Sequence, residues 1–113
     1  MQTMYKQLIV SVFCIGSLAY ALPAAAIETV RMSIKDHTFQ PAEITIPANT
    51  KVKLLIRNQD ISPEEFESDA LHREKLIPGQ TERVIFIGPL DAGSYEFYGE
   101  FNPKTAKGRV IVK

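Results

Sequence analysis

Acidic side chains are concentrated in one short stretch of the chain. Residues 60–74 (DISPEEFESDALHRE) carry six carboxylates against a single arginine, and they include His72. Clustered like charges destabilise a folded protein unless water solvates them or a cation binds them. The charge pattern alone favours a solvated loop or helix face. The alternative is a metal site, because carboxylate oxygens with an imidazole suit Fe, Mn, Cu(II) or Ca, whereas Cu(I) prefers sulfur.

The spacing of these acids allows two of them to meet one ion in either kind of secondary structure. Residues two apart on a strand lie on the same face, so Glu65 with Glu67, or Glu67 with Asp69, would lie together. On a helix, Glu64 and Glu67 would share a face. The spacing therefore supports a shared ion without choosing between the two arrangements.

A second candidate region is YEFYGEFNPKTAKG, residues 95–108. Glu100 stands where an aromatic strand gives way to an Asn-Pro turn, and it is either a solvated loop acid or a metal ligand. Phe97 and Phe101 are expected in the core. His37, in KDHTF, is expected at the surface or at a strand edge, hydrogen-bonded to backbone.

Residues 1–26 have the pattern of a secretory signal peptide. Lys6 is their only charge, an apolar run extends to Leu22, and PAAA follows at residues 23–26. A cationic start, a short apolar segment and an Ala-x-Ala end are the features of such peptides. We expect cleavage after Ala26; an uncleaved anchor and a lipoprotein modified at Cys14 are the alternatives.

The mature chain, residues 27–113, is expected to be a single domain of 87 residues with 12 Lys and Arg against 13 Asp and Glu. This charge balance, with no clustered basic run, argues against nucleic-acid binding. The only cysteine, Cys14, belongs to the signal peptide. The mature domain therefore has no disulfide, thiolate ligand or catalytic thiol, and apolar burial must hold it together.

Alternation of apolar and polar residues predicts strands that are separated by Pro, Gly and Asn turns, as in an antiparallel sandwich or barrel. The runs with this pattern, or with β-branched and aromatic enrichment, are residues 30–35, 44–46, 52–57, 81–87, 94–98 and 107–113. One segment differs, because Ser62-Pro63 is a good helix start and helical spacing follows. Propensity alone predicts a helix from Pro63 to about Leu76.

Two segments resemble the ends of a cupredoxin domain: FQPAEITIPANTKVKLLIRNQD (residues 39–60) and GSYEFYGEFNPKTAKG (residues 93–108). The resemblance implies an all-β, cupredoxin-like Greek-key β-sandwich of about seven or eight strands over residues 27–113. It also implies short strands at residues 66–68 and 74–77, with at most one helical turn near Pro63. We favour these strands over the helix, because tertiary context overrides propensity in so short a span.

The resemblance also shows what this chain lacks. At the positions of the His, Cys, His and Met ligands of a type 1 copper protein, it carries Glu64, Gly99, Asn102 and, near the Met position, Ala106. A blue copper site, with its thiolate–copper bond, cannot form from these residues. In their place are two acidic loops, which the fold is expected to bring together at one end of the sandwich.

With this acidic replacement, the chain is similar to the cupredoxin-like component of bacterial Ftr-type iron-uptake systems and to the cupredoxin domain of EfeO-type proteins. The resemblance implies a periplasmic protein that binds iron, or copper, beside a periplasmic iron-binding protein and an inner-membrane iron permease. The expected metal ligands are Glu64, Glu67 and Glu100, followed by Glu65, Asp69, His72 and Glu74.

Whether the protein is an enzyme stays open at this stage. Anionic ligands stabilise Fe(III) over Fe(II), which would favour ferrous oxidation, with Tyr95 or Tyr98 relaying an electron, but no electron acceptor is evident. The alternative function is a metal-free interaction module whose acidic end docks a basic partner such as a permease loop. The sequence does not decide between a monomer and a homodimer.

Overall fold

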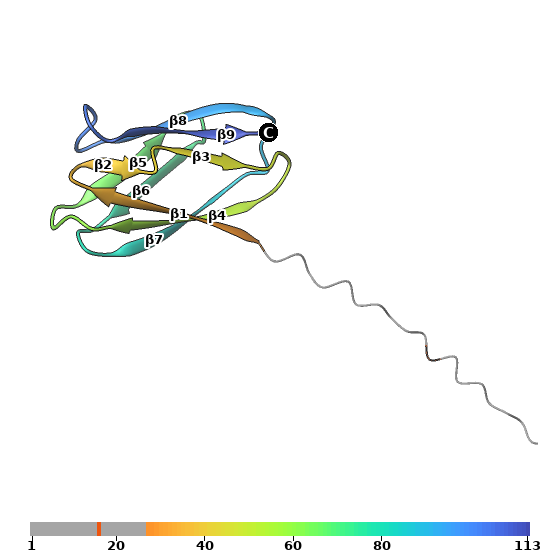
Figure 1. Cartoon of the computed structure of the whole chain (residues 1–113), viewed down its shortest axis with the longest axis horizontal. Coiled ribbons are helices and arrows are strands. Elements are labelled where there is room, and N and C mark those ends of the chain that lie inside the picture. The colour runs from red at the N-terminus through yellow and green to blue at the C-terminus, as the bar shows by residue number, and fades with distance from the viewer. Residues whose placement is uncertain (1–15, 17–26) are drawn as a thin grey trace, which may run out of the picture.

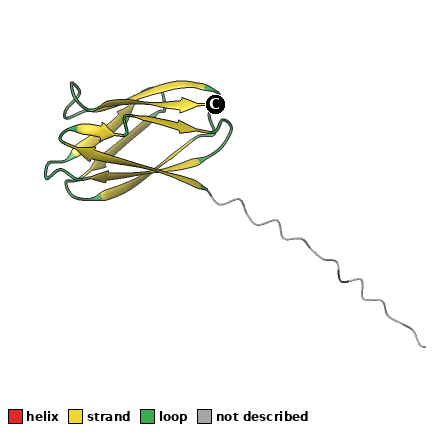
Figure 2. Ribbon diagram, in the orientation of Figure 1, coloured by secondary structure: helices red, strands yellow, loops and turns green. Residues whose placement is uncertain are grey.

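The computed structural model describes residue 16 and residues 27–113, so the expected signal peptide and its cleavage after Ala26 lie, but for residue 16, outside the described residues. The described part is all-β and contains no helix (Figure 2), which confirms the predicted fold class. No helix able to cross a membrane occurs within it. The strands are β1 (Glu28–Lys35), β2 (Thr38–Gln40), β3 (Glu43–Ile46), β4 (Val52–Asn58), β5 (Glu64–Ser68), β6 (Arg73–Ile77), β7 (Glu82–Ile87), β8 (Gly93–Gly99) and β9 (Lys107–Val112).

The nine strands form two sheets that pack face to face (Figure 1). One sheet has the order β2-β1-β4-β7 and the other the order β3-β9-β8-β5-β6. All eight strands expected from the sequence are present. The ninth, β2, has only three residues, which is too short to give an alternation signal.

The sheets are mixed rather than purely antiparallel, so that part of the expectation was wrong. β1 pairs in parallel with β4, and β3 pairs in parallel with β9. Parallel neighbours need a crossover connection, and here β2 and β3 supply it, because the chain changes sheet between β1 and β4. Turn spacing alone does not reveal such crossovers.

Strands β5 and β6 form a hairpin, which confirms the favoured expectation of two short strands here. The helix that propensity alone predicts from Pro63 to about Leu76 is absent, and no helical turn forms near Pro63. β5 lies between β8 and β6 and makes ladder bonds to both. Its side chains alternate between buried and half-buried positions. Pairing on two sides and burial of one face outweigh the helix-start residues at the beginning of the segment.

Three phenylalanines hold the two sheets together at the centre of the core. The rings of Phe66 and Phe97 lie with centroids 5.0 Å apart, and Phe39 packs edge-on against them at 6.0 and 5.1 Å. Such edge-on and tilted contacts are favourable beyond area burial alone. The expectation that Phe97 is a core residue is confirmed, whereas Phe101 lies in a turn and is 50% exposed.

Candidate metal centre

Strand β5 carries acids on both of its faces. Glu64, Phe66 and Ser68 are buried, while Glu65 and Glu67 are half-buried on the outer face of the sheet. The period of two in a strand explains this division, because successive side chains point to opposite faces. The two outward glutamates therefore lie on the same side, as their spacing predicts.

Two further glutamates join Glu65 and Glu67 on this face. Glu74 of β6 is the direct cross-strand partner of Glu67. Glu100 follows β8, and its N–H donates a hydrogen bond of 3.0 Å to the carbonyl of Glu65. Carboxylate oxygens from all four side chains lie within 4.8 Å of one another. We refer to Glu65, Glu67, Glu74 and Glu100 as the carboxylate cluster.

Two oxygens of the carboxylate cluster lack any hydrogen-bond donor. Glu65 Oε1 and Glu67 Oε2 are buried from solvent and have no hydrogen-bond partner within the described part of the chain. No Lys or Arg of residues 27–113 forms an ion pair with any of the four acids. Buried polar atoms are normally satisfied, and a buried carboxylate without a partner is costly. A bound cation would offset the negative charge of such carboxylates.

Hydrogen bonding, burial and neighbouring negative charges raise the pKa of Glu65 and Glu67. A hydrogen bond with Glu74, together with desolvation and the charge of Glu100, raises the pKa of Glu65 to about 7. Desolvation, and then the charges of Glu74 and Glu100, raises the pKa of Glu67 as well. Since metal ligands must be deprotonated, a metal ion binding here would displace a proton that the cluster retains at mildly acidic pH.

Tyr98 borders the carboxylate cluster on the β8 side. It is the cross-strand partner of Glu67 and is half-buried. Desolvation, and then the charges of Asp69 and Glu67, raises the pKa of its phenol. The hydroxyl group of Tyr98 therefore stays protonated at neutral pH.

The structure brings together four of the seven expected ligands. Glu67 and Glu100, which were expected first, lie together with Glu65 and Glu74, which were expected after them. Asp69 and His72 belong to the β5–β6 turn and line a surface depression there. They are not members of the carboxylate cluster.

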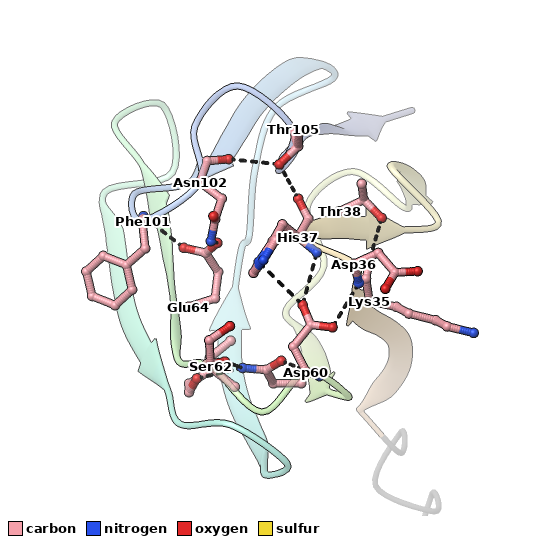
Figure 3. A network of polar contacts seen from close by, with 12 residues as sticks. Lys35, Asp36, His37, Thr38, Asp60, Ser62, Glu64, Phe101, Asn102 and Thr105 are labelled. Carbon is pink, nitrogen blue, oxygen red and sulfur yellow. Dashed lines mark hydrogen bonds and ion pairs between the residues drawn. The ribbon is translucent and has the colours of Figure 1, made fainter.

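Glu64, expected to be a ligand, lies apart from the carboxylate cluster on the inner face of β5. It is 1% exposed, and both of its oxygens accept hydrogen bonds (Figure 3). Oε1 accepts from the N–H groups of Glu65 and Phe101, both at 2.9 Å, and Oε2 accepts from Asn102 Nδ2 at 2.7 Å. The adjacent positions 64 and 65 lie on opposite faces of a strand, which is why neighbouring glutamates have different surroundings.

The four positions that resemblance assigns to copper ligands do converge in space. A Cβ added at Gly99 would lie 2.5 Å from Glu64 Cδ and 2.7 Å from the Cβ of Ala106, and Asn102 holds the same carboxylate. No thiolate or imidazole stands there, and the Glu64 side chain fills the space that a cysteine at Gly99 would need. The residues present do not fit a type 1 copper ion.

The two acidic segments that were expected to meet do come together, because Glu100 joins the glutamates of the β5–β6 hairpin. Glu65 and Glu67 lie on the outer face of β5 and Glu100 lies in the turn after β8, whereas Glu64 is buried on the inner face. Sequence reasoning missed Asn102 as a partner. The sequence did contain a signal for this contact: Glu64 and Asn102 stand at two of the copper-ligand positions, which lie close together in a cupredoxin.

His37 lies in the turn between β1 and β2, as expected for a surface histidine. Its side chain is 49% exposed, and its Nδ1 lies 3.7 Å from Asp60 Oδ2. The carboxylate of Asp60 also accepts hydrogen bonds from the N–H groups of Asp36 and His37, at 2.8 and 3.0 Å. His37 therefore belongs to a turn that Asp60 stabilises, away from the carboxylate cluster.

Comparison with known families places this arrangement in context. The family model of the cupredoxin-like domain matches residues 7–112. The chain belongs to the cupredoxin-like domain family. This cupredoxin-like chain is also 45% identical over 83 residues to the uncharacterized protein RP394 of Rickettsia prowazekii (strain Madrid E). The match covers 74% of this chain and 66% of that relative, so the chain spans just under two thirds of the relative's length.

Solved structures share the cupredoxin-like fold at low sequence identity. The metal-binding domain of the Cu(I)-exporting P-type ATPase CopA of Streptococcus pneumoniae superposes with a TM-score of 0.69 and 21% identity, covering 77% of this chain and 86% of that one. Auracyanin A, a blue copper protein of Chloroflexus aurantiacus, gives a TM-score of 0.66 and 13% identity, covering 75% and 98%. At this identity the likeness concerns the fold alone.

Proposed function

We propose that this protein captures iron in the bacterial periplasm, with copper as the alternative ion, through the carboxylate cluster. One observation carries the proposal: four glutamates converge, and two of their buried oxygens have no hydrogen-bond donor. Four negative charges within such a small space are stable only when protons or a cation offset them. A cation-binding site accounts for both the convergence and the missing donors.

The donor set narrows the choice of ion to hard cations. Carboxylate oxygens favour Fe, Mn and Ca over Cu(I), which prefers sulfur. The choice of iron among these ions is supported by the resemblance to Ftr-type and EfeO-type proteins. The same resemblance supports a place beside a periplasmic iron-binding protein and an inner-membrane iron permease. Because anionic ligands stabilise Fe(III) more than Fe(II), binding here would favour the oxidised ion.

Calorimetric titration of residues 27–113 with Fe(II), Fe(III), Cu(II), Mn(II) and Ca(II) tests the proposal. We expect one site per chain, with the highest affinity for iron. The double variant Glu67→Gln, Glu100→Gln should weaken binding at least 100-fold. The control, Glu28→Gln with Glu82→Gln, removes the same charge from exposed positions on the other sheet and should leave binding unchanged.

Two results would contradict the proposal. Unchanged binding in the Glu67 and Glu100 double variant would refute the site. Failure of every ion to bind would refute metal capture and favour the metal-free interaction module, whose partner would then have to be basic.

The periplasmic location has its own test. Fractionation of the producing bacterium should release the protein with the periplasmic contents, and N-terminal sequencing should begin at Ile27. Retention in the membrane fraction with an intact N-terminus would contradict the proposed export and cleavage.

A further inference from the structure

The buried carboxylate of Glu64 connects the two segments that supply the carboxylate cluster. Its Oε1 atom accepts a hydrogen bond from the N–H of Glu65, a cluster member on β5, and another from the N–H of Phe101, both at 2.9 Å. Phe101 is the residue directly after Glu100. One oxygen atom thus joins the backbone of Glu65 to that of Phe101, the residue next to Glu100; Figure 3 shows the bond to Phe101.

Three consecutive N–H groups hold the backbone around Glu100. The N–H of Gly99 donates to the carbonyl of Ala106 at 2.8 Å, and that of Glu100 donates to the carbonyl of Glu65 at 3.0 Å. The third, from Phe101, goes to Glu64. Of these three hydrogen bonds, only the one from Phe101 has a side-chain acceptor, so a substitution can remove it. Glu100 itself is exposed and lies in a turn.

Asn102 fixes the orientation of the Glu64 carboxylate. Its Nδ2 donates to Oε2 at 2.7 Å, which leaves Oε1 aimed at the two N–H groups. Gly99 permits this arrangement, because a Cβ there would lie 2.7 Å from Oε2. Glu64, Asn102 and Gly99 are not members of the carboxylate cluster, yet their contacts surround the Phe101 N–H bond that follows Glu100.

We propose that Glu64, oriented by Asn102, is a positioning residue for the metal centre: its carboxylate holds Glu100 beside Glu65 so that all four glutamates reach one ion. This inference rests on the proposed metal-binding function of the carboxylate cluster. It assigns Glu64 a role through Glu100 and no contact with the metal. Charge-assisted hydrogen bonds of this kind are stronger than neutral ones and are well suited to hold a turn.

The variant Asn102→Asp tests the role while leaving every cluster carboxylate in place. It sets a second carboxylate against Glu64, which should turn the Glu64 side chain away and release Glu100. We expect the affinity for iron to fall at least tenfold. Adding Glu64→Gln to the same chain lets the amide at position 64 donate to the carboxylate at position 102, the reverse of the wild-type bond. The affinity should then return to within about threefold of the wild type.

A double-mutant cycle shows whether the effect passes through Glu100. If it does, Asn102→Asp should change the affinity less than twofold in a chain that already carries Glu100→Gln. An equal loss of affinity in both backgrounds would overturn the proposal, as would an Asn102→Asp variant that binds iron as tightly as the wild type. The control Ile46→Val, in the core at the far edge of the sheet, should lower the unfolding midpoint without changing the affinity.

Amide hydrogen exchange of the metal-free protein supplies a readout that needs no ion. The Phe101 amide should be protected in the wild type, exchange at least tenfold faster in Asn102→Asp, and regain protection when Glu64→Gln is added. Equal exchange in all three chains would overturn the positioning role. If the wild type binds no ion, the proposed function fails, and this experiment still decides whether Glu64 holds the turn.

Discussion

Glu67 and Glu74 face each other as a direct cross-strand pair of like charge on the β5–β6 hairpin. Sheets usually place opposite charges or apolar groups at such positions, because like charges directly opposite destabilise the pairing. Here the pair coincides with the point where Glu65 and Glu100 also converge. Repulsion between these acids should therefore destabilise the metal-free hairpin. An ion bound by the carboxylate cluster would offset the repulsion and should stabilise the fold.

Replacement of Glu74 by Gln should separate these two effects. Without metal at pH 7.5, the variant should unfold at a temperature a few degrees above that of the wild type, because the cross-strand repulsion is gone. Its affinity for iron should fall about tenfold or more. Calorimetry measures both quantities, and Glu28→Gln, an exposed acid on the other sheet, serves as the control. A lower unfolding temperature would contradict the repulsion.

The stability of the metal-free protein should decrease as the pH rises from about 4.5 to about 7. The pKa of Glu65 is raised from 4.5 to about 7 in the folded protein, so over this interval the folded state holds a proton that the unfolded state has lost. Urea unfolding at pH 4.5, 5.5, 6.5 and 7.5 measures the trend. The variant Glu65→Gln should flatten it, and an unchanged slope in that variant would refute the assignment.

Asp60 should behave in the opposite sense at lower pH. Hydrogen bonds from the backbone of His37, and then of Asp36, hold its pKa below 3.8 despite partial desolvation. The stabilisation is present above about pH 4 and is lost as the pH falls through the lowered pKa. Replacing Asp60 by Ala should lower the free energy of unfolding at pH 7 by about 1–3 kcal/mol. A variant as stable as the wild type would show that the turn needs no such acceptor.

Substitution of Gly99 should be far more damaging than substitution of Gly93. A Cβ at Gly99 would lie 2.5 Å from Glu64 Cδ, whereas one at Gly93 would first meet Tyr95 at an ordinary 3.6 Å. Forced overpacking of this kind costs about 1–3 kcal/mol. Chemical denaturation of Gly99→Ala and Gly93→Ala measures the difference, and equal stabilities would contradict the close approach of Glu64.

Addition of Cu(II) should give no intense blue absorption. That colour requires a cysteine thiolate on the copper, and Gly99 stands at the position that resemblance gives to the cysteine. A visible absorption titration with the wild-type protein is sufficient. A strong blue band would overturn the assignment of the copper-ligand positions.

The strands could be predicted from the sequence because burial of one face leaves a visible alternation. β5 is the instructive exception. Local propensity at Ser62-Pro63 indicates a helix, and the strand was expected only from the resemblance to a cupredoxin; pairing of β5 with both β8 and β6 explains why the strand forms. Local sequence patterns also could not predict the parallel pairing of β1 with β4, because it depends on where the chain changes sheet.

The carboxylate cluster could be predicted only in part, for a related reason. Glu64, Glu65 and Glu67 are chemically identical, and a register difference of one residue decides which face each occupies. Glu74 enters because of the hairpin register, and Glu100 because of a bond to Glu65 over a long sequence separation. The charge pattern alone favoured a solvated face, with a metal site as the alternative, and the place where the four glutamates meet depends on three-dimensional pairing.

The Glu64–Asn102 hydrogen bond has a consequence for how cargo would be exchanged. Because donors of the chain itself satisfy both oxygens of the buried Glu64 carboxylate, this carboxylate needs no ion to balance it. The carboxylate cluster, by contrast, lies on an outer sheet face with Glu74 and Glu100 exposed. Loading and unloading would then proceed at the surface while the sandwich stays shut. Under the proposed function, an ion could therefore be exchanged without any opening of the buried core.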